Sequence, residues 1–287
     1  MFISFHATTR LEAWPLPATR STLPMTRSPV LFVSHGAPTF ALQPGLLGPR
    51  LTAVGDQLPR PRALLVVSPH WITRGVRVST SSAPETVHDF GGFDRALYRL
   101  QYPAPGEPEL AARTVDLLKA AGWPAEADPG QGLDHGAWVP LRFLYPEADV
   151  PVFQVSLPAG IGPEQAYALG FALRPLRDEG VMVVGSGSLT HNLYEFRMNA
   201  QGEAAYAREF AGWVRETVEA RDDQRLLRTM ELAPHAHRAH PTTEHLLPLL
   251  VAAGAAAGDA QVETLEGGIS YGVLAMDSYL FGAPGAH

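Results

Sequence analysis

Short apolar segments alternate along this chain with segments of helical length, and this alternation restricts its fold more than any other feature. Several of the apolar segments are hydrophobic at every position, as expected for strands buried on both faces of a sheet. The alternation predicts an α/β fold: a single layered domain with a mostly parallel central sheet, helices on both faces and extra C-terminal strands. Strands are expected at 30–34, 63–68, 76–80, 151–156 and 181–185, with one or two more within 261–281. Helices are expected at 46–58, 107–121, 136–145, 163–177, 203–220 and 242–254.

The chain has 287 residues, and neither an internal repeat nor a linker-like tract divides it after residue 24. We therefore expect residues 25–287 to form one domain. Residues 1–24 lack the long apolar stretch of a secretory signal, and Met25 opens a segment that reads like a natural protein start. These features predict that residues 1–24 are a disordered N-terminal extension.

The charge and residue composition exclude several classes of function. The formal net charge is −7, which disfavours nucleic acid as a partner. No apolar run approaches the ~18–20 residues of a membrane span, so we expect a cytoplasmic protein with no membrane partner. The chain has no cysteine, so disulfides, thiolate metal sites and cysteine nucleophiles are impossible. Any transition metal must be held by His, Asp or Glu, which directs attention to the eleven histidines.

Two histidines follow two expected strands at the same relative place. His35 comes directly after the strand 30–34, and His70 follows the strand 63–68. In open α/β sheets, ligands bind at the carboxyl ends of the strands. Neutral imidazole is a common ligand for zinc and iron, and loops at strand ends can gather ligands that lie far apart in sequence. The pattern therefore indicates a metal site at this edge of the sheet.

Further histidines can reach the same edge. His191 lies in "GSGSLTHNL", just past the strand 181–185. His240 precedes Pro241, which suits the first turn of the helix expected at 242–254, so we expect His240 at the start of that helix. His245 lies four residues later and could face the same side of the helix, with Glu244 beside it. From the residues alone, the ligand that this segment supplies stays open among these three side chains.

Two other histidines, His88 and His135, each sit in a glycine-containing turn beside an aspartate, where a structural role and a role in a pocket wall are about equally plausible. Other known chemistry lacks its signature. The segment "GSGS" follows a strand, but the patterns GxGxxG and GxxxxGK[ST] are absent, which disfavours nucleotide binding. The GxSxG nucleophile elbow of serine hydrolases is absent as well.

Six motifs in a fixed order resemble one known family over nearly the whole chain after Met25. The set resembles the class III extradiol ring-cleavage dioxygenases, specifically their DOPA 4,5-dioxygenase-like branch. Each motif alone is weak, and the ordered set is specific. The motifs are "VSHGAP", "VSPHW", "HDFGGF", "DHGAWVPL", "GSGSLTHNL" and "AHPTTEHLLPL".

The resemblance implies a single α/β catalytic domain that binds one non-haem metal, normally Fe(II), and opens a catechol ring with O₂. It implies that His35, His70 and His240 bind the metal and that His191 is the catalytic acid/base beside it. His135 would line the substrate pocket, and the loop that carries His88 would help to cover it. The expected partners are a small, DOPA-like catechol and O₂, in a monomer or a small homo-oligomer.

Two alternatives accompany this interpretation. Many extradiol enzymes bind Fe(II) through two histidines and one carboxylate, so Glu244 stays a candidate ligand. Three histidines and a water also fit a catalytic zinc site, so Zn(II) could occupy the purified protein. A zinc-dependent hydrolase, or a metal-binding relative without activity, would carry the same residues.

Overall fold

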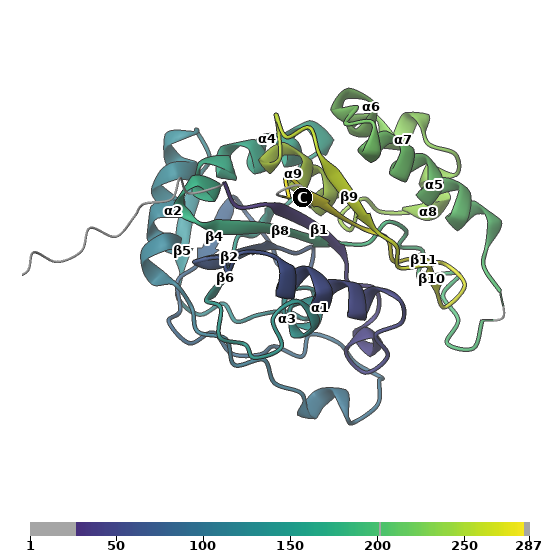
Figure 1. Cartoon of the computed structure of the whole chain (residues 1–287), viewed down its shortest axis with the longest axis horizontal. Coiled ribbons are helices and arrows are strands. Elements are labelled where there is room, and N and C mark those ends of the chain that lie inside the picture. The colour runs from purple at the N-terminus through teal and green to yellow at the C-terminus, as the bar shows by residue number, and fades with distance from the viewer. Residues whose placement is uncertain (1–26, 201, 284–287) are drawn as a thin grey trace, which may run out of the picture.

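The computed structural model describes residues 27–200 and 202–283 (Figure 1), so the extension predicted at 1–24 lies outside the described residues. Its centre is a six-stranded sheet in the order β6-β2-β8-β1-β12-β9. The first four strands of this order run parallel to one another, and the last two are antiparallel additions from the C-terminal segment. The strands are β1 (Val30–Ser34), β2 (Ala63–Val67), β6 (Val152–Gln154), β8 (Val181–Gly187), β9 (Val262–Leu265) and β12 (Ser278–Phe281).

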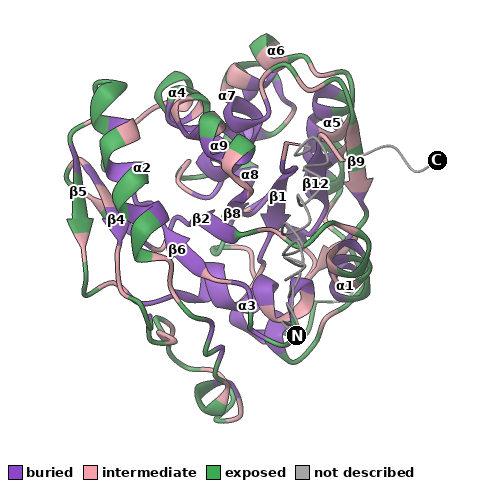
Figure 2. Ribbon diagram, turned by 60° about the vertical axis from the view of Figure 1, so that its left-hand side comes forward, coloured by how far each residue is buried: buried purple, intermediate pink, exposed green. Residues whose placement is uncertain are grey.

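Helices cover both faces of this sheet, and the strands between them are buried (Figures 1 and 2). Helices α9 (Leu247–Ala255) and α4 (Pro163–Leu173) lie on one side, and α1 (Leu47–Gln57) and α3 (His135–Leu144) lie on the other. Every residue of β1, β2 and β8 is buried, as the uniformly apolar segments predict. The predicted α/β layering with a mostly parallel sheet is confirmed.

The remaining elements surround this centre. Helix α2 (Pro108–Ala120) packs beside the parallel pair β4 (Val76–Ser79) and β5 (Ala125–Asp128), which is separate from the main sheet. Helices α5 (Ala205–Glu219), α6 (Asp223–Leu227), α7 (Thr229–Leu232) and α8 (Ala236–Ala239) follow one another at the periphery. The shortest elements are β3 (Ile72–Thr73) with β7 (Leu157–Pro158), β10 (Ile269–Ser270) with β11 (Leu274–Ala275), and the 3₁₀ turns Pro38–Ala41, Leu97–Arg99 and Arg174–Glu179.

One predicted boundary is wrong in a way that affects the site. The helix expected at 242–254 begins only at Leu247, with Pro248 in its first turn. Proline suits this position because its missing N–H is not needed there. His240 instead ends the short helix α8, and residues 240–246 form a turn in which the Leu246 N–H donates to the Thr243 carbonyl at 2.9 Å. His240 and His245 therefore do not share a helix face.

Candidate active site

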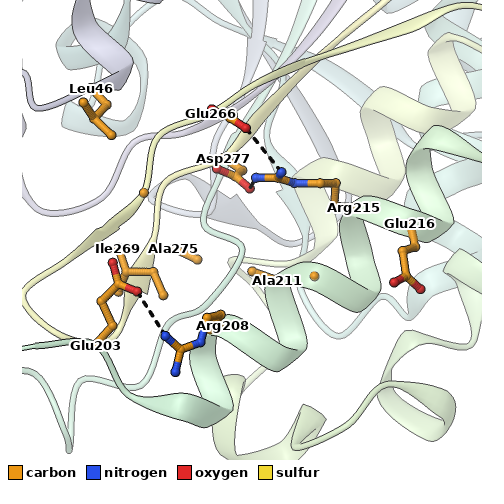
Figure 3. A pocket seen from close by; sticks show the side chains of 12 residues that line it. Leu46, Glu203, Arg208, Ala211, Arg215, Glu216, Glu266, Ile269, Ala275 and Asp277 are labelled. Carbon is orange, nitrogen blue, oxygen red and sulfur yellow. Dashed lines mark hydrogen bonds and ion pairs between the residues drawn. The ribbon is translucent and has the colours of Figure 1, made fainter.

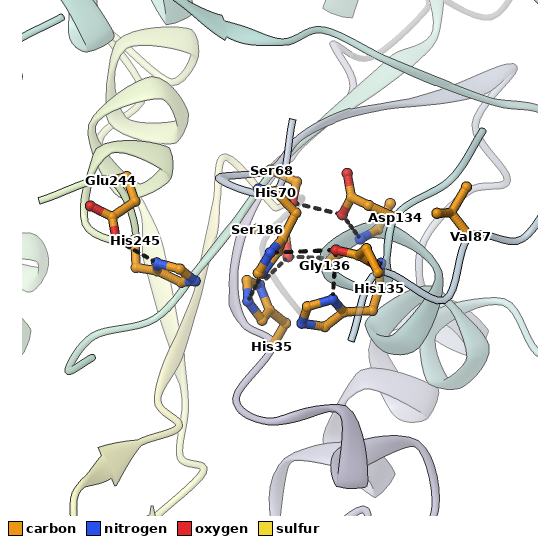
Figure 4. Close-up of polar contacts among 12 residues, drawn as sticks. His35, Ser68, His70, Val87, Asp134, His135, Gly136, Ser186, Glu244 and His245 are labelled. Carbon is orange, nitrogen blue, oxygen red and sulfur yellow. Dashed lines mark hydrogen bonds and ion pairs between the residues drawn. The ribbon is translucent and has the colours of Figure 1, made fainter. Parts of the chain in front are cut away.

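Three imidazoles converge at the carboxyl ends of the parallel strands (Figure 4). His35 follows β1, His70 follows β2, and His245 lies in the turn before α9. Each offers one ring nitrogen, and the three nitrogens lie within 4.8 Å of one another. His35 Nε2 and His70 Nε2 are 3.2 Å apart. Three segments that are distant in sequence thus place one donor atom each around a single point.

The sheet and a glycine fix the position of His35. Its backbone N–H donates to the Gly187 carbonyl at 2.9 Å, which extends the β1–β8 pairing by one residue. Gly36 then turns the chain with a φ of +62°, in the left-handed region that favours glycine. A Cβ atom at Gly36 would also lie 2.7 Å from the Sδ atom of Met276. The strand therefore ends in a histidine whose ring is held at the sheet edge while the chain leaves it.

Ser186 fixes which nitrogen of His35 carries the hydrogen. The Ser186 hydroxyl donates to the Gly136 carbonyl at 2.5 Å, so it accepts at its other contact, from His35 Nδ1 at 2.9 Å. Nδ1 therefore carries the hydrogen, and Nε2 keeps a lone pair. That lone pair is on the nitrogen closest to His70.

A buried polar network supports His70. The His70 N–H donates to the Ser68 hydroxyl at 3.2 Å, and that hydroxyl donates to Asp134 Oδ1 at 2.8 Å. Asp134 also caps α3 by accepting from the Ala137 N–H at 3.1 Å, and its second oxygen accepts from the Gln154 amide at 2.7 Å. Burial raises the pKa of Asp134. The network ties the turn after β2 to the start of α3.

Close backbone approach brings His245 into the site. The Ser188 N–H donates to the His245 carbonyl at 2.9 Å, and a Cβ atom at Gly187 would lie 2.3 Å from that carbonyl oxygen. Only glycine allows this contact. His245 Nδ1 lies 3.3 Å from Glu244 Oε1, whereas its buried Nε2 has no hydrogen-bond partner among the described residues. A buried nitrogen without a partner is costly unless another group binds it.

Burial keeps these imidazoles uncharged. It lowers the pKa of His35 and of His245 well below the ordinary value of 6.5, and it lowers that of His70 to about 3. Repulsion between neighbouring histidines acts in the same direction at all three residues. Neutral imidazole is the form that binds metals.

The geometry and the donor set fit one transition-metal ion. Two nitrogens that each lie about 2.1 Å from one ion, at an angle of about 100°, are separated by about 3.2 Å. The His35 and His70 Nε2 atoms show that separation. The unpartnered Nε2 of His245 adds a third donor.

His240, which the family resemblance predicts as the third ligand, lies elsewhere. It is fully buried, its Nε2–H donates to the Leu189 carbonyl at 2.7 Å, and its ring packs against Phe210 at a centroid distance of 5.4 Å. It belongs to none of the groups of potential metal ligands found among the described residues. The difference follows from the late start of α9, because the turn at 240–246 directs His245 toward the sheet edge.

The other histidines expected in the site lie around the three donors. The His191 ring is stacked on His245, with centroids 3.4 Å apart and planes 10° apart, so it adjoins the cluster. Burial lowers the pKa of His191. The centroid of the His135 ring lies 3.9 Å from the centroid of the His70 ring and 5.5 Å from that of the His35 ring. His88 is more remote: its Nε2–H donates to the Leu100 carbonyl at 3.0 Å, which anchors its own loop.

A separate groove of about 430 Å³ lies between α5 and the C-terminal strands (Figure 3). Two arginines of its lining pair with acidic side chains: Arg215 donates to Asp277 at 2.5 Å, and Arg208 lies 3.7 Å from Glu203. The groove has no histidine in its lining. The histidine cluster at the sheet edge therefore lies outside this groove.

Comparison with known proteins agrees with this site. Residues 49–282 match the family described as the catalytic LigB subunit of aromatic ring-opening dioxygenase. The chain belongs to this family of extradiol dioxygenases. Two relatives carry the name 4,5-DOPA dioxygenase extradiol: that of Beta vulgaris is 38% identical over 87% of this chain and 95% of its own length, and that of Escherichia coli is 38% identical over 90% and 96%. The predicted family and enzyme class are confirmed.

The fold of this dioxygenase has also been seen in a solved structure. The crystal structure of an uncharacterized protein from Escherichia coli K12 superposes with a TM-score of 0.75 and 33% identity, covering 88% of this chain and 99% of that one. In the described part of the dioxygenase, no helix is both long and apolar enough to cross a membrane.

Proposed function

We propose that this extradiol dioxygenase opens the ring of a small, DOPA-like catechol with O₂ and that Fe(II) is its working metal. The observation that carries the proposal is the convergence of three imidazoles that burial keeps neutral: their ring nitrogens lie within 4.8 Å of one another, and one of them, His245 Nε2, is buried without a hydrogen-bond partner among the described residues. The names of the relatives from Beta vulgaris and Escherichia coli support DOPA as the first substrate to test.

The metal would be held by His35, His70 and His245. Three protein ligands leave positions open for the two adjacent oxygens of a catecholate and for O₂. Iron would supply the exchange of electrons between ring and O₂ that side chains cannot perform. His245 would take the place of the predicted ligand His240, because it, and not His240, groups with the other two among the described residues.

The protein itself would handle the protons. A catechol loses phenolic protons when its oxygens bind, and a neutral imidazole close to the site can accept one. His191 fits this role because its lowered pKa keeps it neutral near pH 7 and its ring lies flat against His245. His135 would contact the substrate from the other side, since its ring lies beside that of His70. His88 would act only indirectly, by holding the loop that carries Phe90 near the His135 ring.

The ligand assignment can be tested with the matched variants His245→Gln and His240→Gln. Binding of about 10–16 kcal/mol by four ligands corresponds to roughly 2.5–4 kcal/mol per ligand. Removal of one ligand should therefore weaken metal binding about 10²–10³-fold. We expect His245→Gln to lose Fe(II) and ring-opening activity, while His240→Gln keeps both, because glutamine can still donate to the Leu189 carbonyl. Metal loss in His240→Gln alone would reverse the assignment.

The metal and the reaction are tested together by anaerobic loading of the metal-free enzyme with Fe(II) or Zn(II). We expect O₂ uptake and a yellow ring-opened product from DOPA with Fe(II) only. Three histidines also suit a catalytic zinc site. Hydrolytic activity with Zn(II), without ring opening by the Fe(II) form, would replace the proposed reaction with metal-assisted hydrolysis.

A further inference from the structure

We propose that Asp89 is a positioning residue whose single carboxylate sets the tautomer of two imidazoles, His70 and His135. The inference deepens the proposed function, since one of these rings would bind the metal and the other the substrate. It is carried by the position of the Asp89 carboxylate beside the two rings: His70, Asp89 and His135 form one of the three groups of potential ligand atoms found among the described residues.

The contacts of Asp89 are specific. Its Oδ1 accepts from the backbone N–H of His135 at 2.9 Å, and its Oδ2 accepts from the Nδ1–H of the same residue at 3.0 Å. Oδ2 also lies 3.5 Å from His70 Nδ1. The Asp89 side chain is 23% exposed, against 7% for His135 and 21% for His70. The Asp89 carboxylate thus hydrogen-bonds the His135 ring and lies beside the His70 ring.

An ionised carboxylate only accepts hydrogen bonds, so it selects the hydrogen-bearing nitrogen in each ring. Both oxygens of Asp89 face groups of His135 that can donate, Oδ1 its backbone N–H and Oδ2 its Nδ1, so both oxygens act as acceptors toward that residue. Asp89 therefore holds the hydrogen of His135 on Nδ1 and leaves a lone pair on its Nε2, and the same oxygen, 3.5 Å from His70 Nδ1, favours that tautomer in His70. In His70, that lone pair is on the nitrogen 3.2 Å from His35 Nε2. In Figure 4 the His135 ring is directed toward His35, so its Nε2 acceptor faces the cluster.

Backbone pairing holds Asp89 against the segment that carries His135. The Val87 N–H donates to the Leu133 carbonyl at 2.8 Å, and the Leu133 N–H donates to the Glu85 carbonyl at 2.8 Å. The Trp138 indole N–H donates to the Val87 carbonyl at 2.9 Å. Residues 85–89 therefore run alongside the start of α3, which keeps the Asp89 backbone beside His135.

The other nearby carboxylate does not share this role. Asp134 is occupied by the Ser68 hydroxyl, the Gln154 amide and the cap of α3, and neither of its oxygens bonds to an imidazole. It orients the backbone of the His70 turn, whereas Asp89 contacts the rings themselves.

Asp89→Asn is the informative change because it keeps the shape of the side chain and replaces the acceptor that faces His135 Nδ1 with a donor. The Asn carbonyl can still accept from the His135 N–H, which places the amide NH₂ against His135 Nδ1. Two donors cannot face each other, so His135 is expected to move its hydrogen to Nε2 and accept from the amide. The ring would then present a donor to the substrate where the native enzyme presents an acceptor.

The tautomer can be read directly by ¹⁵N NMR of the metal-free protein at neutral pH, with His135→Gln used to assign the signals. We expect native His135 to carry hydrogen on Nδ1 and Asp89→Asn to carry it on Nε2. The control is Asp94→Asn, an exposed aspartate of the same loop that caps the Ala96 N–H. Its His135 signals should be those of the native protein.

The kinetics and metal affinity of the metal-loaded enzyme supply a second measurement. We expect Asp89→Asn to lower kcat/KM for a catechol about 10–100-fold, with much of the loss in KM, because a hydrogen bond to substrate is lost. Metal affinity should fall about 10–100-fold through His70. An unchanged His135 tautomer in folded Asp89→Asn overturns the proposal. Because that measurement needs neither metal nor substrate, it stands apart from the test of ring opening.

Discussion

His240 provides a sensitive test of the electrostatics of this fold, because it is buried but outside the ligand cluster. Burial lowers its pKa from 6.5 to about 4 in the folded protein. The unfolded chain restores the ordinary value, so it binds a proton more strongly than the folded protein does. Stability is therefore expected to fall as the pH falls from 6.5 toward 4.

The magnitude follows from the two pKa values. A pH of 5 is 1.5 units below the pKa of 6.5 that His240 has in the unfolded chain. Each unit is worth about 1.36 kcal/mol, so protonation of the unfolded imidazole favours unfolding by about 2 kcal/mol. The folded form is still mostly neutral there. His70, with a pKa of about 3, adds a similar amount, and His35 and His245 act in the same direction. The sum is a large share of the roughly 5–15 kcal/mol of a typical domain.

The assay is urea unfolding of the metal-free protein at pH 7 and pH 5, followed by the fluorescence of its five tryptophans. His240→Gln keeps a donor for the Leu189 carbonyl and does not titrate. We expect its loss of stability between the two pH values to be about 2 kcal/mol smaller than in the native protein. His237→Gln, an exposed histidine of α8, is the control and should lose as much as the native protein. Equal losses in all three proteins would refute the reasoning.

Two further substitutions test the supports of the site. Ser186→Ala leaves His35 Nδ1 and the Gly136 carbonyl without partners, so calorimetric metal titration should show about 10–100-fold weaker binding and urea unfolding a loss of about 1–3 kcal/mol. Its control, Ser188→Ala, removes only a bond to the Thr190 carbonyl and should keep metal affinity. His191→Phe preserves a flat ring against His245, so metal content should be unchanged while kcat falls about 10²–10⁴-fold; loss of metal would make His191 a ligand.

The central strands can be predicted from the sequence because each one is marked by a short run of consecutive hydrophobic residues. The strands at 30–34, 63–68 and 181–185 are hydrophobic at consecutive positions, and a strand buried on both faces requires that pattern. His35 and His70 follow from the same signal, since each lies just past one of these strands. Their convergence depends only on parallel strands ending at one edge.

The third histidine of the cluster could not be predicted from strand patterns, because its position depends on where a helix begins. Pro241 and Pro248 are both acceptable at the start of a helix, and local preference does not choose between them. Packing makes the choice: α9 starts at Leu247, and the seven residues before it form a turn. A shift of the helix start by a few residues exchanges His240 for His245 at the site.

The segment "GSGS" contains the information that would have distinguished these histidines. Side chains alternate across a strand, so Gly185 and Gly187 face one side and Ser186 the other. Cβ atoms at the two glycines would lie 2.1 Å from the Pro248 carbonyl oxygen and 2.3 Å from that of His245. Small residues at alternate positions thus mark the strand that the chain around 245–248 must approach closely, while Ser186 holds His35 on the opposite side. The segment 185–188, whose glycines could suggest a phosphate-binding loop, is instead the strand end against which the backbone of His245 packs.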